Sequence, residues 1–154
     1  MTMLEDDLIG LTGAIWESVL GMGALPIDPS AANARLGGHT ITSCVHITGE
    51  WEGSLAMTFG PALSRRLAAG MFGLDDADLD DELVRDAVGE LANIAGGNVK
   101  GMVAADTELS LPQIIEGNGY TLSVPGTRVL CEAGFECGAD TFVVTVHGRS
   151  DLPA

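Results

Sequence analysis

The segment from about Leu79 to Ala104 constrains the fold most, because its apolar residues repeat with the period of an α-helix. On a helical wheel with about 100° per residue and Glu90 at zero, one set of apolar side chains falls together. They lie between about 100° and 160° from Glu90 and form the predicted buried stripe: Val84, Val88, Leu91, Ala95 and Met102. We therefore expect a long helix with one buried side.

Other segments predict further helices and the links between them. Residues 4–20 have leucine, isoleucine and valine at steps of three and four, which indicates an amphipathic helix that stops at the GMG sequence. Residues 24–38, rich in proline and small side chains, are expected to form a loop. Pro61 can open a short helix that reaches Phe72, and the acidic stretch 73–83 is expected to be a solvated bridge that caps the long helix.

The remaining segments predict strands. Residues 39–47 and 50–59 alternate apolar with polar around Gly49, which is typical of a hairpin. After the long helix, strand-like runs alternate with Gly and Asn, at residues 107–115, 119–124, 127–135 and 140–148. The predicted fold is a single domain over residues 1–154, of the α/β (α+β) class. It would have one mixed or antiparallel sheet of about five to six strands, covered by about three helices.

The charge of the chain excludes some kinds of partner. Seven basic residues against 22 acidic ones give a formal charge of −15. Binding to a nucleic-acid backbone depends on Lys and Arg, of which this chain has few. An anionic membrane surface would repel the negative net charge of the chain. We therefore expect no nucleic acid and no membrane as partners, and instead a partner that presents positive charge or a cation.

Several features predict a reduced, cytoplasmic environment. The first residues are acidic where a secretory signal needs basic ones, and no apolar stretch approaches the length of a membrane span. The three cysteines, Cys44, Cys131 and Cys137, contain no CxxC pair and are expected to be buried thiols. Trp16 and Trp51 are expected in the core or at a dimer contact, and His147 is expected to be structural.

A polar ridge, Asp86, Glu90 and Asn93, lies on the exposed side of the predicted long helix. A carboxylate and a carboxamide one turn apart could bind a cation, orient a water, or simply face solvent. Gly96 and Gly97 follow, and glycine inside a helix costs about 1 kcal/mol relative to alanine. This pair is explained either by close packing against a neighbouring element or by clearance for a molecule that approaches from outside.

Sequence patterns of other active sites are missing. The chain contains no phosphate-binding loop, no dinucleotide fingerprint and no nucleophile elbow. His39, Cys44 and His46 invite a zinc interpretation, but they lack a second cluster of ligands, so we expect ordinary strand residues and no metal site.

The segment DAVGELANIAGGN resembles the D/S-x-x-x-E-x-x-N helix of the CheC, CheX and FliY family of chemotaxis phosphatases. The similarity covers Asp86, Glu90 and Asn93, and LSLPQIIEG resembles the proline-bearing segment that follows this helix, with eighteen residues between Asn93 and Pro112. Residues 4–20 contain no second E-x-x-N. One motif per chain resembles the CheX branch, which implies a CheX-like fold and a homodimer joined through its sheets.

This resemblance implies a phosphatase that hydrolyses the aspartyl phosphate of a CheY-like receiver domain. Asn93 would hold the attacking water and Glu90 would pair with a lysine of the receiver. Further contacts to the partner would come from Asp86, Gly97, Lys100 and Pro112. The chain would need no cofactor of its own, because the receiver carries Mg²⁺. The alternative is a receiver-binding adaptor or a switch-complex component that keeps the fold without catalysis.

Overall fold

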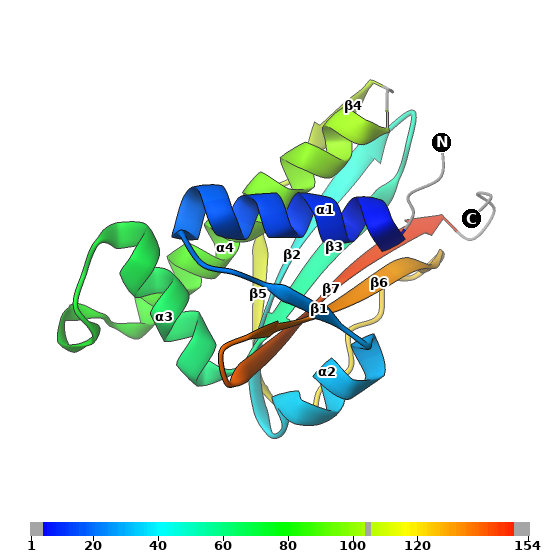
Figure 1. Ribbon diagram of the computed structural model, residues 1–154. Helices are drawn as coiled ribbons and strands as arrows, with labels where there is room; N and C mark the ends of the chain where they lie inside the picture. Colours follow the sequence, from blue (N-terminus) through cyan, green and yellow to red (C-terminus); the bar gives the residue numbers. More distant parts are fainter. Residues whose placement is uncertain (1–4, 104–105, 150–154) are drawn as a thin grey trace.

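The computed structural model (Figure 1) describes residues 5–103 and 106–149. Its helices are α1 (Glu5–Ile15), which continues as a π-helical turn (Trp16–Leu20), α2 (Pro29–Leu36), α3 (Pro61–Phe72), a 3₁₀ turn (Asp76–Asp78) and α4 (Asp81–Met102). Its strands are β1 (Leu25–Ile27), β2 (His39–Gly49), β3 (Gly53–Phe59), β4 (Thr107–Leu109), β5 (Gln113–Asn118), β6 (Thr127–Cys137) and β7 (Asp140–Arg149).

All seven strands of the described chain belong to one sheet. The strand order is β1-β6-β7-β3-β2-β4, and β5 also pairs with β2. Every pairing is antiparallel. The predicted α+β class and single sheet are therefore confirmed, with more strands and one more α-helix than we expected.

One face of the sheet packs against α1, α3 and α4 and holds the main core. Alternate residues of each strand point to this face, as the period of a β-strand requires. The rings of Trp16 and Phe142 are stacked with centroids 4.3 Å apart, and Phe59 and Phe135 pack around Phe142. Trp51 is also buried in this core. Of the two expected locations, the core and a dimer contact, both tryptophans occupy the core.

Helix α2 covers the opposite face and corrects the predicted loop over residues 24–38. Thr141, which points away from Phe142, donates a hydrogen bond of 2.9 Å to the Ala32 carbonyl. Asp28 caps this helix by accepting a 2.7 Å bond from the Ser30 N–H, and Pro29 occupies its first turn. A capping side chain and an N-terminal proline both favour a helix start, so the proline begins α2 instead of breaking it.

Two strand predictions in the second half are wrong in detail. The run 107–115 is split into β4 and β5 because Pro112 has no N–H to donate to a neighbouring strand. Residues 119–124 form no strand; they lead from β5 to β6, and the Tyr120 hydroxyl bonds to the Thr42 hydroxyl of β2.

The helix boundaries follow the predictions closely. The N-terminal helix ends where Gly21 adopts a left-handed conformation, at the GMG sequence. Its predicted first residue, Leu4, lies outside the described residues, and so does the predicted last residue of the long helix, Ala104.

Cys44, Cys131 and Cys137 are buried free thiols, as expected. In the described ranges, no helix is both long and apolar enough to cross a membrane.

Candidate active site on helix α4

Helix α4 is fixed at its start by a side-chain cap and along its length by the sheet. The Asp80 carboxylate accepts a 2.8 Å hydrogen bond from the Leu83 N–H, and Asp81 and Glu82 lie at the positive end of the helix dipole. The predicted stripe packs inward, with Met102 half-buried and the others buried: Val84, Val88, Leu91 and Ala95.

The polar ridge lies on the outer side of this helix, as predicted. Asp86 and Glu90 are exposed and Asn93 is half-buried. Within residues 5–103 and 106–149, these three side chains form no hydrogen bond and no ion pair. The ridge is therefore free to bind a water or a partner.

Asn98 gives a direct contrast on the same helix. Its carboxamide nitrogen donates a 2.9 Å hydrogen bond to the Ile94 carbonyl. This bond occupies the side chain on its own helix backbone, a common use of asparagine inside a helix. Of these two carboxamides, only that of Asn93 is free of intramolecular bonds in the described structure.

The two adjacent glycines, Gly96 and Gly97, have different surroundings. Close packing and clearance for a partner, the two explanations considered for the pair, therefore apply to them differently. A Cβ on Gly96 would lie 2.6 Å from Val45 Cγ2 and 3.0 Å from Leu109 Cδ1, so Gly96 is a packing residue. A Cβ on Gly97 would meet no atom within 4 Å. Clearance therefore remains an explanation for Gly97, whereas for Gly96 it is replaced by helix-to-sheet packing.

The structure also brings Pro112 to this helix, although 18 residues separate it from Asn93 in the sequence. A Cβ on Gly89 would lie 3.3 Å from Pro112 Cγ, so the proline ring touches the helix one residue before Glu90. Lys100 lies two turns beyond Asn93, at the C-terminal end of the same side, and is half-buried. The predicted site residues thus lie on the outer side of α4, with Pro112 beside that helix.

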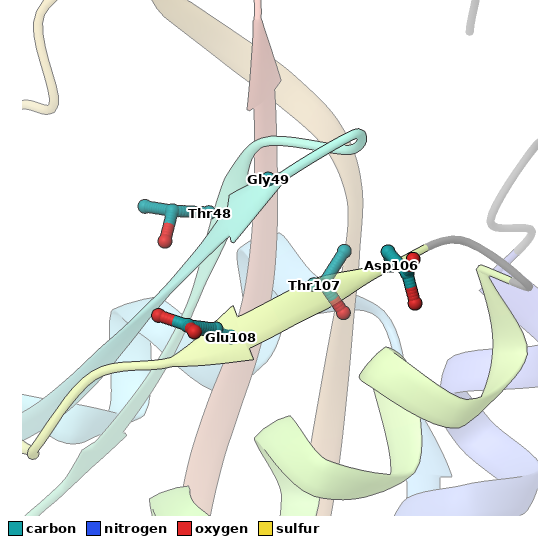
Figure 2. A pocket seen from close by; sticks show the side chains of 5 residues that line it. All are labelled: Thr48, Gly49, Asp106, Thr107 and Glu108. Carbon is teal, nitrogen blue, oxygen red and sulfur yellow. The ribbon is translucent and has the colours of Figure 1, made fainter.

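A hollow lies apart from these residues, at the end of the β2–β3 hairpin beside β4 (Figure 2). It measures about 330 Å³ and is lined by Thr48, Gly49, Asp106, Thr107 and Glu108. Thr48 and Glu108 are paired across the two strands and point to the same side. The backbone of Asp106 is already hydrogen-bonded to Glu50 through both its N–H and its carbonyl. None of the predicted site residues is among its lining residues.

The side chains that invited a zinc interpretation have other partners. His39 Nε2 lies 3.2 Å from Glu116 Oε2, and His46 Nε2 lies 3.2 Å from Gln113 Oε1. Cys44 is buried, and burial raises the pKa of its thiol. Across the described parts of the chain, no three or more His, Cys, Asp or Glu side chains are grouped so that they could hold a metal ion.

His147 lies on β7 on the sheet face opposite the main core, where its Nδ1 atom is buried without a hydrogen-bond partner. Burial lowers the pKa of this imidazole, although the nearby Glu132 carboxylate acts in the opposite direction. A neutral, half-buried imidazole in a sheet fits the structural role expected for it.

Fold and surface together define an α+β protein that presents a free carboxylate and a free carboxamide on the outer side of a sheet-backed helix. The family model of the chemotaxis phosphatase CheX matches residues 41–136, which is more than half of the chain and includes the whole ridge and Pro112. The chain belongs to the CheX family.

Individual relatives agree with this assignment. The chain is 30% identical over 92 residues to a Thermotoga maritima protein named CheY-P phosphatase CheX; the match covers 58% of this chain and 59% of that protein. The chain thus spans about three fifths of the length of this relative.

Solved structures show the same fold. The chemotaxis protein CheX from Vibrio vulnificus superimposes with a TM-score of 0.75 at 18% identity, over 92% of this chain and 93% of that one. CheX in the CheX-CheY-BeF3-Mg complex from Borrelia burgdorferi gives a TM-score of 0.70 at 17% identity, over 92% and 94%.

Proposed function

We propose that this chain accelerates hydrolysis of the aspartyl phosphate of a CheY-like receiver domain by docking helix α4 against the receiver's active site. The observation that carries the proposal is the free pair Glu90 and Asn93 on the open side of α4, in a chain of the CheX family. The Thermotoga relative is named a CheY-P phosphatase, and the Borrelia relative was solved with CheY, BeF3 and Mg.

Asn93 is the proposed catalytic residue. Its carboxamide can accept a hydrogen bond from a water molecule and donate another, so it can hold the water oxygen in line with the phosphorus without changing its own protonation state. A bond forms between the water oxygen and phosphorus while the bond to the aspartyl oxygen breaks, which releases inorganic phosphate. Positioning supplies most of the available acceleration in such phosphoryl transfers.

Glu90 anchors the helix in this proposal. Its exposed carboxylate would form a charge-assisted bond with a lysine of the receiver's active site. Asp86 would extend that contact by one turn, and Gly97 would leave room for the partner's backbone. Lys100 would contact the receiver at the C-terminal end of the surface, and Pro112 beside the ridge near Gly89.

The metal in this reaction would belong to the partner. A Mg²⁺ ion in the receiver would neutralise the phosphoryl oxygens, as Mg²⁺ does in other phosphoryl-transfer sites, and this chain would supply only the carboxamide and the docking surface. We therefore propose that it functions without a cofactor of its own.

The proposal is tested by phosphorylating receiver domains from the same genome and following the decay of the phosphate. We expect wild-type protein to accelerate the decay, Asn93→Ala to lose about 10²-fold or more in kcat, and Glu90→Ala to raise KM. Asn98→Ala is the matched control, since it removes another asparagine from the same helix, and it should keep full activity. Unchanged decay with wild-type protein for every receiver would refute the phosphatase function.

An adaptor would give a different result. If wild-type protein binds a receiver but leaves its phosphate untouched, the chain is a docking component with the CheX fold. The predicted homodimer is tested separately by light scattering, and the predicted cytoplasmic location by fractionation of cells.

A further inference from the structure

The segment from Leu109 to Pro112 runs beside α4 in the opposite direction. Leu109 contacts the helix at Gly96, and Pro112 contacts it at Gly89. Seven residues of helix correspond to about 10 Å along its axis. The three residues from Leu109 to Pro112 cover this distance, and the pairing with β2 shifts by one residue between Leu109 and Gln113. Leu111 therefore lies level with the helical turn that carries Glu90 and Asn93.

This segment also lies on a definite side of the ridge. Residues of an α-helix are about 100° apart, so the line through Gly89 and Gly96 is about 40° to 60° from Asn93. The segment thus borders the ridge on the side of Asn93. Its presence agrees with the half-buried state of Asn93, whereas Glu90 on the far side of the ridge is exposed.

Hydrogen bonds hold the segment in place. The Ser110 N–H donates a 2.8 Å bond to the His46 carbonyl, and the Ser110 hydroxyl accepts a 2.9 Å bond from the His46 N–H. Pro112 fixes its own backbone angle φ and packs on Gly89. Leu111 is therefore presented by a backbone that is fixed on both of its sides.

The side chain of Leu111 nevertheless packs against almost nothing. It is 85% exposed, more than the other large exposed apolar side chains of the described chain, of which the next is Leu25 at 61%. Leu25 lies on β1, at the opposite edge of the sheet from β4 and β5. An apolar side chain on a backbone that is already fixed saves the entropy cost of ordering that backbone on binding, which favours its use as an interface anchor.

We infer that Leu111 is the apolar anchor of the receiver-docking surface, inserting into an apolar patch of the receiver on the Asn93 side of the ridge. This inference rests on the proposed function and names a contact that the phosphatase motif does not contain. The receiver is the partner we favour because Leu111 borders the free polar ridge and is level with the helical turn that carries Glu90 and Asn93. An anchor there would add affinity for the receiver without touching the reacting atoms.

The test separates docking from chemistry. Leu111→Ser should raise KM for the phosphorylated receiver, and Kd for a receiver loaded with BeF3 and Mg²⁺, by about tenfold, the effect of losing a moderate hot spot. Its kcat should stay within about twofold of wild type, and Leu111→Met should restore most of the affinity. Leu25→Ser removes a comparably exposed leucine and should change neither constant. Thermal unfolding should be unaltered in all three variants.

Each other outcome overturns the inference. Equal KM and Kd for Leu111→Ser and Leu25→Ser would show that Leu111 does not contact the receiver. Loss of self-association in Leu111→Ser would assign Leu111 to a contact between copies of this chain. If wild-type protein neither binds nor dephosphorylates any receiver, the proposed function fails and this inference fails with it; an active wild type with an unaffected Leu111→Ser contradicts the inference alone.

Discussion

Gly96 and Gly97 are consecutive in the chain but lie on different sides of α4. Gly96 is buried, and the space of its missing side chain is filled by Val45 and Leu109. Gly97 is exposed and lies one turn after Asn93, with open space around it. Stability explains the first glycine. The second gives up helix stability without any packing gain, which agrees with the proposed clearance for a partner.

Alanine substitutions should separate these two roles. Gly97→Ala should stabilise the protein by about 0.5 to 1 kcal/mol, because alanine favours the helix and meets no neighbour, yet it should raise KM for the receiver by crowding the docking surface. Gly96→Ala should destabilise the protein by about 1 to 3 kcal/mol, because its methyl group overlaps Val45. Urea unfolding gives both free energies. A Gly97→Ala variant with unchanged kinetics would leave that glycine without a functional explanation.

At the scale of the element, α4 depends on the cap at its first turn. Asp80→Ala should lower the free energy of unfolding by about 1 kcal/mol, since it removes the bond to the Leu83 N–H. Urea unfolding monitored by circular dichroism measures the loss. Asp78→Ala is the matched control, because it removes the same charge from the preceding 3₁₀ turn without removing a cap. Equal effects of both substitutions would mean that charge, and not capping, determines the result.

The elements predicted correctly are those with long, regular patterns. Helix α4 and the hairpin of β2 and β3 each repeat their apolar residues over several turns or pairs, so local pattern and tertiary packing agree. Strand β1 is three residues long, too short to show any alternation. Helix α2 carried a usable signal, an aspartate followed by proline, but its proline and small side chains suggested a loop.

The candidate site also has a part that local sequence patterns predict and a part that they do not. Asp86, Glu90 and Asn93 share one helix, so their spacing in the sequence already places them together. The position of Leu111 could not be predicted from spacing, because it depends on the pairing of β5 with β2 and on the contacts at Gly89 and Gly96. Such long-range contacts are set by the sheet register, which no local pattern specifies.

At the scale of the whole molecule, the net charge of −15 should oppose folding through self-repulsion. Arg35, Arg65, Arg66 and Arg85 form ion pairs with carboxylates in the described residues, but acidic residues greatly outnumber basic ones. Salt shortens the screening length from about 30 Å at 0.01 M to about 8 Å at 0.15 M. Repulsion between distant carboxylates is therefore screened more than the close ion pairs are.

We accordingly expect the unfolding temperature to rise as NaCl increases over this range, by about 2 to 4 °C for each 1 kcal/mol of relieved repulsion. Calorimetry measures the shift. The double variant Asp75→Asn with Asp78→Asn removes two exposed charges from the turn before α4, so it should unfold at a higher temperature in low salt and respond less to added salt. A fall in unfolding temperature with salt would show instead that the ion pairs, and not the repulsion, dominate the electrostatics of this fold.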